Sequence, residues 1–255
     1  MLADPKKKNT NKKKRNMASS PTPTYVAVNP ASWKLGNVST SPKGLKKVEI
    51  LTAEGGKPVF QLWKPSDPFL RAPYGISEPF CDGVPPTSAQ QTNTSVSVKT
   101  MPLELKHGPH LEFAHHIDTV LLGLIHANQI KLLDLHPDDE LLPISMLRRQ
   151  FCGFVKPSKK PEYPATARVK VNVGSSELAT HFSKLQPNKQ LIPCASDNMV
   201  RNCTVIPIIE VGSLWLNSTG GYGVTAQASQ ILIMSSGVVN TPSFSGLEFA
   251  INMEV

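Results

Sequence analysis

Flat aromatic side chains and cationic side chains occur together at several places in this sequence. An aromatic ring can stack on any nucleic-acid base, and Lys or Arg can follow the phosphate backbone, so this mixture favours a single-stranded nucleic acid as the ligand. The aromatic residues are Trp63, Tyr74, Tyr163, Trp215 and Tyr222. The cationic residues are Lys64, Arg71, Lys156, Lys159, Lys160, Arg168 and Lys170. We expect these residues to bind nucleic acid, with Tyr163 and Tyr222 the best exposed rings because they lie beside Pro and Gly in turns.

Catalytic chemistry has little support in the sequence. It contains no GxSxG elbow, Cys-His signature, HExxH motif or phosphate-binding loop. We therefore predict no catalytic residue, no cofactor and a protein that is not an enzyme.

A metal site is the other chemistry to consider, because "HGPHLEFAHH" holds His107, His110, His115 and His116. His115 and His116 are adjacent, so on a helix they point about 100° apart. We interpret all four as ordinary surface histidines. The four cysteines, Cys81, Cys152, Cys194 and Cys203, form no CxxC pair. They indicate reduced thiols in an intracellular protein rather than a zinc site.

The net charge of +8 is concentrated at the N-terminus, where residues 1–16 hold seven Lys or Arg and one Asp. The remaining residues, 20 basic and 18 acidic, are almost balanced. We expect residues 1–20 to be a disordered basic tail that attracts phosphate or directs nuclear import, and residues 21–255 to form one domain. No apolar run reaches membrane-spanning length and no secretory segment follows the basic start, so we predict a host nucleus or a cytoplasmic replication site.

The residue pattern indicates a mainly β fold with one helical insertion. Strands are predicted at 45–51, 59–63, 94–105 and 163–173, followed by a hairpin over 203–234. Its apolar residues Val205, Ile209, Val211, Leu214 and Leu216 are expected to be buried. In the strand at 163–173, Val169, Val171 and Val173 point to one side and Arg168 and Lys170 to the other. Apolar residues recur every three or four positions from Ala114 to Leu135, which predicts helices at about 111–150.

Three segments together resemble a known family: "VFQLWKPSDPFLRAPYGIS", "KPSKKPEYPATARVKVNV" and "CTVIPIIEVGSLWLNSTGGYGVTAQASQILI". The order and approximate spacing of Tyr74-Gly75, Tyr163-Pro164 with Lys170, Trp215 and Tyr222-Gly223-Val224 are similar to those of OB-fold single-stranded-DNA-binding proteins of large nucleocytoplasmic DNA viruses. That family is distantly like the single-stranded-DNA-binding protein of short-tailed phages. One departure is Thr225-Ala226-Gln227, where similar proteins carry aromatic or basic residues.

The resemblance implies an elaborated five-stranded OB-like barrel that binds single-stranded DNA with little sequence preference. Such a protein coats and protects DNA during viral replication, recombination or repair. Replication proteins, RNA and further copies of the chain are candidate partners, and the sequence leaves the choice between DNA and RNA and the oligomeric state open. No membrane partner is implied.

Two alternatives remain open from the residues. A lysine-rich arm ahead of a Pro-rich β domain also describes a viral coat protein, whose arm neutralises packaged nucleic acid and whose β domain forms a shell. The apolar stripe of the insertion helix could also be a docking surface for another protein, although core packing explains the stripe equally well.

Overall fold

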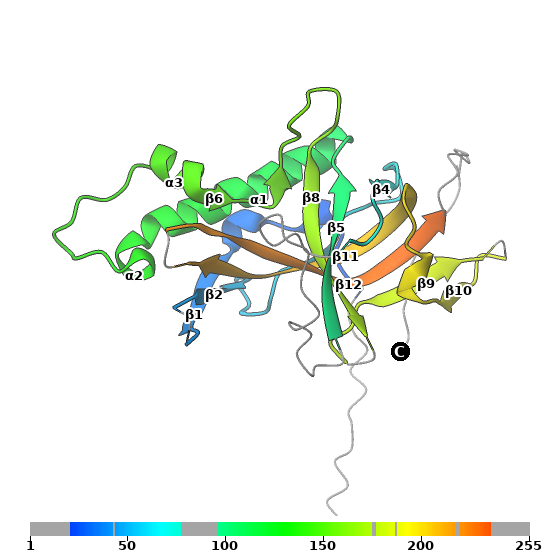
Figure 1. Ribbon diagram of the computed structural model, residues 1–255, viewed down its shortest axis with the longest axis horizontal. Helices are drawn as coiled ribbons and strands as arrows, with labels where there is room; N and C mark the ends of the chain where they lie inside the picture. The colour runs from blue at the N-terminus through cyan, green and yellow to red at the C-terminus, as the bar shows by residue number, and fades with distance from the viewer. Residues whose placement is uncertain are drawn as a thin grey trace, which may run out of the picture.

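The computed structural model describes residues 21–42, 44–77, 96–174, 177–186, 188–217 and 220–235. The predicted basic tail and Cys81 lie outside these ranges. Figure 1 shows one large curved sheet with helices along one side of it.

The centre of the sheet is an antiparallel hairpin of two long strands, β11 (Cys203–Leu216) and β12 (Tyr222–Ser235). In the turn between them, the Asn217 side-chain oxygen accepts a 2.6 Å hydrogen bond from the Gly221 amide, and Gly220 has a φ of 86°. Asn and Gly tolerate these turn conformations better than other residues do. The predicted hairpin is therefore confirmed.

The sheet extends from this hairpin on both sides, in the order β1-β2-β11-β12-β8-β5. The outer strands are β1 (Lys34–Thr40), β2 (Lys46–Leu51), β8 (Thr166–Gly174) and β5 (Val96–Glu104). Short strands complete it: β3 (Val59–Gln61), β4 (Leu70–Ala72), β6 (Phe151–Cys152), β7 (Val155–Lys156), β9 (His181–Leu185) and β10 (Leu191–Pro193). Single-turn 3-10 helices lie at Tyr25–Ala27, Pro30–Ser32 and Ser196–Asn198.

The sheet curls back on itself. β4 pairs with β11, and Ser77, just after β4, exchanges two backbone hydrogen bonds of 2.8 Å with Thr100 of β5. The path β4-β11-β12-β8-β5 thus returns to its start. The mainly β, OB-like barrel is confirmed, although the whole sheet has more strands than the five predicted because it includes the β1–β2 extension and the short strands.

The apolar side of the sheet follows the predicted alternation. Val205, Ile209, Val211, Leu214 and Leu216 are all buried, as predicted. The change from odd to even positions coincides with a register shift between Val211 and Ser213, where a β-bulge moves the next residues to the opposite face. On β8, Val169 and Val171 are buried while Arg168 and Lys170 are exposed.

The helical insertion consists of α1 (Gly108–Ala127), α2 (Gln129–Leu133) and α3 (Ile144–Gln150), as expected at about 111–150. In its apolar stripe, Ala114, Ile117, Leu121 and Leu132 are buried and Leu124 and Leu135 are partly buried, so core packing accounts for most of the stripe. None of the helices in the described ranges has the length and apolar character needed to cross a membrane.

Candidate nucleic-acid interface

The side of the sheet opposite the core carries a group of polar and cationic residues brought together by strand register. Trp215 on β11 lies opposite Lys47 of β2 and opposite Gly223 of β12. Gln227 of β12 lies beside Lys170 of β8, and Arg168 follows the same alternation as Lys170. We name this surface the open face and define it by Lys47, Trp215, Gln227, Arg168 and Lys170.

Trp215 is held against the sheet and stays partly exposed. A Cβ atom added at Gly223 would lie 2.7 Å from Cζ2 of Trp215 and 2.5 Å from the carbonyl oxygen of Cys152. Only glycine leaves room for the indole at this position. The Tyr222-Gly223 pair of the sequence motif therefore supports Trp215 through its glycine.

The open face has an excess of positive charge. Loss of water around the ammonium, and then repulsion by Lys47, lower the pKa of Lys170. Neither lysine has an ion-pair partner among the residues that the structure describes. Glu49, the acidic residue of the same β2 face, accepts a hydrogen bond from the Asn37 amide instead. A phosphate group would supply the missing negative charge between the two lysines.

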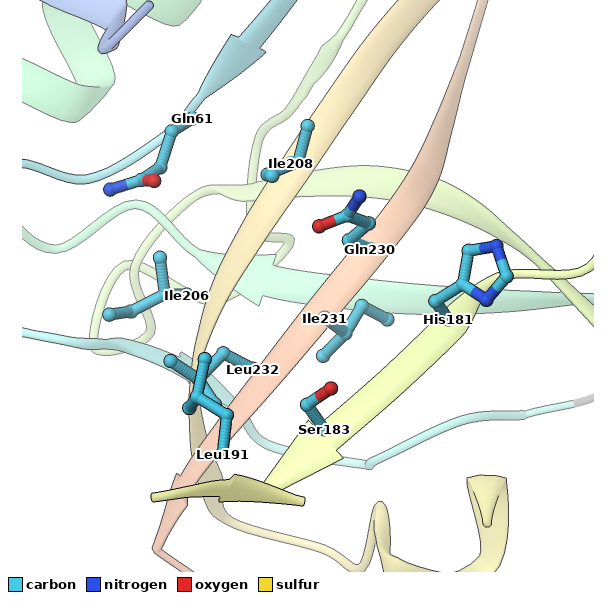
Figure 2. A pocket seen from close by; sticks show the side chains of 9 residues that line it. All are labelled: Gln61, His181, Ser183, Leu191, Ile206, Ile208, Gln230, Ile231 and Leu232. Atoms are coloured by element: carbon cyan, nitrogen blue, oxygen red, sulfur yellow. The ribbon is translucent and has the colours of Figure 1, made fainter. Parts of the chain in front are cut away.

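A shallow pocket continues the open face along β11 and β12 (Figure 2). Gln230 of β12 lies between Ile208 of β11 and His181 of β9, and Gln61 of β3 lies beyond Ile208. The Gln230 side-chain oxygen is buried and has no hydrogen-bond partner within the described ranges. A rotation of the side chain would be needed to bring this oxygen to the surface of the pocket, where it could accept an N–H group from a ligand.

The connection between β7 and β8 carries a second cationic group. Lys159, Lys160 and Tyr163 are exposed, and the Lys160 ammonium lies 6.0 Å from the centroid of the Tyr163 ring. Lys156 pairs with Thr166, which places it on the Arg168 side of the sheet, where it is half-buried. The expected exposure of Tyr163 is confirmed, with 59% of its surface accessible.

Two of the predicted stacking residues are buried, and a stacking role for them is wrong. Tyr222 is 1% exposed because it pairs with Leu216 on the core side, and its hydroxyl donates a 2.6 Å hydrogen bond to the Leu147 carbonyl. Burial raises its pKa to about 12. Trp63 is 3% exposed, stacks on Phe69 and donates to the Asp67 carbonyl.

Three other predicted residues lie at the β4 end of the hairpin. β4 pairs with residues 203–205 of β11, whereas β2 pairs with residues 213–216, so this group is separated from Lys47 and Trp215 (Figure 1). Tyr74 is exposed. Arg71 binds Asn202 and lies 3.6 Å from Glu104, and Lys64 lies 4.0 Å from Asp67, so their charges are partly neutralised.

The four neighbouring histidines do not behave alike. His115 and His116 are exposed, as expected. His110 is 1% exposed and its Nε2 lies 2.9 Å from a carboxylate oxygen of Asp67, so the interpretation of it as a surface histidine is wrong. The sequence separates Asp67 from the histidines by a long connection, and no local pattern indicates their contact.

Comparison with known proteins gives no family. No protein-family model matches the sequence, and no curated protein matches it.

Solved structures give weak matches. The single-stranded DNA-binding protein from bacteriophage Enc34 in complex with ssDNA has 11% identity and a TM-score of 0.36 over 79% of this chain and 96% of that one. The crystal structure of gp2.5, a single-stranded DNA-binding protein encoded by bacteriophage T7, has 9% identity and a TM-score of 0.39 over 74% of this chain and 98% of that one.

Proposed function

We propose that this protein binds single-stranded DNA with little sequence preference, through the open face and the β7–β8 connection. The observation that carries the proposal is the position of Trp215 beside Lys47 on a face that also holds Lys170 and Arg168. The indole supplies a stacking surface, and the cations lie where a phosphate backbone can pass. None of these contacts depends on the identity of the base.

The sheet geometry supports this proposal. OB-type barrels commonly bind single strands on one face of a curled sheet, because the strands present a row of outward side chains there. Here the outward residues of β2, β11, β12 and β8 form such a row. The core residues are on the opposite side, so a bound strand would not disturb packing.

The proposed cellular role is to coat and protect single-stranded DNA during viral replication, recombination or repair, in the nucleus or at a cytoplasmic replication site. Under this proposal the virus belongs to the large nucleocytoplasmic DNA viruses, and the basic tail adds unspecific attraction to phosphate. Replication proteins are the expected further partners, and the role is one of binding rather than catalysis.

A fluorescence-anisotropy titration of labelled oligo-dT tests the proposal. At low salt we expect saturable binding that weakens steeply as salt increases, because counterions are released from the phosphates. A duplex of equal length and an RNA oligonucleotide are the comparison ligands. Absence of oligo-dT binding at low salt, or tighter binding of the duplex, would remove the proposed function.

The coat-protein alternative has the basic arm in its favour, but the described strands belong to one curled sheet rather than two facing sheets. Size-exclusion chromatography separates the two functions. A megadalton particle that contains nucleic acid would favour the coat protein, and a small species that shifts on oligo-dT addition would favour the proposed one.

A further inference from the structure

Three side chains of types that bind metal ions converge where the β3–β4 connection meets the start of α1. Nε2 of His110 lies 2.9 Å from Oδ2 of Asp67, and Nε2 of His107 lies 3.4 Å from Oδ1 of the same carboxylate. One potential ligand atom from each residue lies within 4.8 Å of the other two. Ligands about 2.0–2.2 Å from a tetrahedral zinc ion are separated by similar distances, so small adjustments would admit an ion.

The cluster is built into the fold rather than gathered on a loose surface. The side chains of Asp67 and His110 are each 2% exposed, and that of His107 is 30% exposed. His107 is the N-cap residue of α1 and His110 lies in its first turn, so both rings extend from one end of the helix.

Asp67 lies on the other side of the cluster, where hydrogen bonds within its own turn hold it in place. Its amide donates to the Lys64 carbonyl, and its carboxylate accepts from the Lys64 amide at 3.3 Å. Its carbonyl accepts a hydrogen bond from the Trp63 indole at 2.9 Å. This preorganisation lowers the entropic cost of binding an ion.

A buried hydroxyl also lies beside the cluster. The Tyr25 ring packs edge-on against His110, and its hydroxyl is buried. Burial, and then the interaction of the hydroxyl with the Asp67 carboxylate, raise the pKa of Tyr25 to about 12. Tyr25 therefore faces the same carboxylate as the two histidines, and its hydroxyl can bind a water molecule held by a metal ion.

The buried histidine of the cluster, His110, is in a suitable state to bind an ion. Burial lowers the pKa of His110 and outweighs the opposite effect of Asp67, so the imidazole is neutral at neutral pH. Neutral imidazole is the form that binds metals.

We propose that Asp67, His107 and His110 bind one divalent transition-metal ion, with zinc as the best fit, and that a water molecule near Tyr25 completes the coordination. Two imidazoles and a carboxylate are a common zinc ligand set. The ion would tie the β3–β4 connection of the sheet to the first turn of the helical insertion. This site is independent of the open face.

Lys64 opposes the site, and its effect can be tested. Its ammonium lies 4.0 Å from Oδ1 of Asp67 and would repel a divalent cation. The side chain is about one-third exposed, so the ammonium can move into solvent when an ion binds. Removal of this charge should therefore tighten metal binding, whereas removal of a ligand should weaken it.

The experiment uses the full chain, treated with a chelator, dialysed and titrated with Zn²⁺ by calorimetry. Co²⁺ is the spectroscopic probe, because four-coordinate Co²⁺ has strong visible absorption. We expect one equivalent of Zn²⁺ per chain, and a rise in Tm of about 5–10 °C at a zinc concentration near 100 times Kd.

Matched variants decide the assignment. His107→Gln, at the partly exposed ligand, should weaken zinc binding at least about tenfold and remove the cobalt spectrum. His115→Gln and His116→Gln, exposed histidines on the same helix, should leave both unchanged, and Lys64→Gln should tighten binding. Failure to bind one equivalent, or equal losses in His107→Gln and the two control variants, would overturn the proposal. So would unchanged affinity in Lys64→Gln.

Discussion

Lys47 of β2 and Lys170 of β8 lie close enough for the charge of Lys47 to lower the pKa of Lys170, although β11 and β12 separate their strands in the sheet. The twist and curl of the sheet bring the two ammonium groups toward one region of the open face. Neither ammonium has an acidic partner among the residues that the structure describes, so the two like charges repel each other in the free protein. A bound phosphate would relieve that repulsion.

The first prediction concerns these lysines. Lys47→Gln and Lys170→Gln should each weaken oligo-dT binding and reduce the slope of log K against log salt by about 0.7 for each phosphate that is no longer neutralised. Lys170→Gln should not lower the Tm, because it removes a charge that partial loss of hydration and repulsion by Lys47 disfavour. Anisotropy titrations at several salt concentrations measure the slope.

The control for this pair is Lys131→Gln, an exposed lysine of α2 on the helical side of the protein. It changes the net charge by the same amount and should leave the salt slope unchanged. An equal decrease in all three variants would show that only the overall charge matters.

The second prediction uses the three tryptophans as reporters. Trp33 and Trp63 are buried at 4% and 3% exposure, so Trp215 is the indole that a base can reach. Oligo-dT should quench part of the tryptophan fluorescence, and Trp215→Phe should abolish that quenching. Trp215→Ala should weaken binding by about 1–3 kcal/mol, the usual contribution of one stacked base.

Anisotropy with a labelled oligonucleotide gives the affinity of Trp215→Phe independently of its own fluorescence. If the quenching persists in Trp215→Phe while the protein remains folded, the stacking surface lies elsewhere.

The third prediction distinguishes Tyr163 from Tyr222, which the sequence pattern predicted to be equally exposed. Tyr163→Ala should weaken oligo-dT binding with little change in stability, because the ring is exposed. Tyr222→Phe should leave DNA affinity unchanged and reduce stability by about 1 kcal/mol, since it loses the hydrogen bond to Leu147. Urea unfolding and anisotropy on both variants measure the two effects. A loss of DNA affinity in Tyr222→Phe with none in Tyr163→Ala would contradict the proposed interface.

The contrast between these tyrosines shows what the sequence could and could not predict. Period-two alternation identified β8, the hairpin and their buried residues, because burial of one face imposes that pattern directly. Proximity to glycine indicated a turn but not the side on which Tyr222 lies, since that depends on where β12 begins and on its pairing with Leu216.

Residues brought together by long-range pairing were missed for the same reason. Lys47 joins Trp215 only through the β2–β11 register, and Gln230 reaches its pocket after a register shift in the hairpin. Asp67, in the β3–β4 connection, contacts His110 of α1, although β4 and β5 lie between them in the sequence. Such contacts are properties of the assembled sheet rather than of any local segment.

The fourth prediction tests the support beneath Trp215. Gly223→Ala would place a Cβ atom 2.5 Å from the Cys152 carbonyl oxygen and 2.7 Å from Trp215, so it should destabilise the protein by about 1–3 kcal/mol and weaken DNA binding. Gly123→Ala in α1, where an added Cβ meets nothing within 4 Å, is the matched control. It should stabilise the protein by about 0.5–1 kcal/mol. Equal behaviour of the two variants in thermal unfolding would contradict the packing of Trp215 on Gly223.

The last prediction follows from the buried His110. Burial lowers the pKa of its folded form below the ordinary value of 6.5, despite Asp67, while His107 and Lys64 disfavour a further positive charge and Tyr25 packs on the ring. The unfolded chain therefore binds the proton more readily than the folded chain. The contribution of neutral His110 to the free energy of unfolding should therefore be fully present above pH 6.5, and it should be lost as the pH falls below that value.

Thermal unfolding of the chelator-treated chain between about pH 5 and pH 8 measures this dependence. His110→Gln should lower the Tm at every pH. It should also make the Tm less dependent on pH below about 6.5, because the titrating group is gone. His115→Gln, at an exposed histidine of the same helix, should retain the slope of the unmodified chain. If His110→Gln also retains that slope, the acid sensitivity arises from other groups, and burial of a neutral His110 is not its cause.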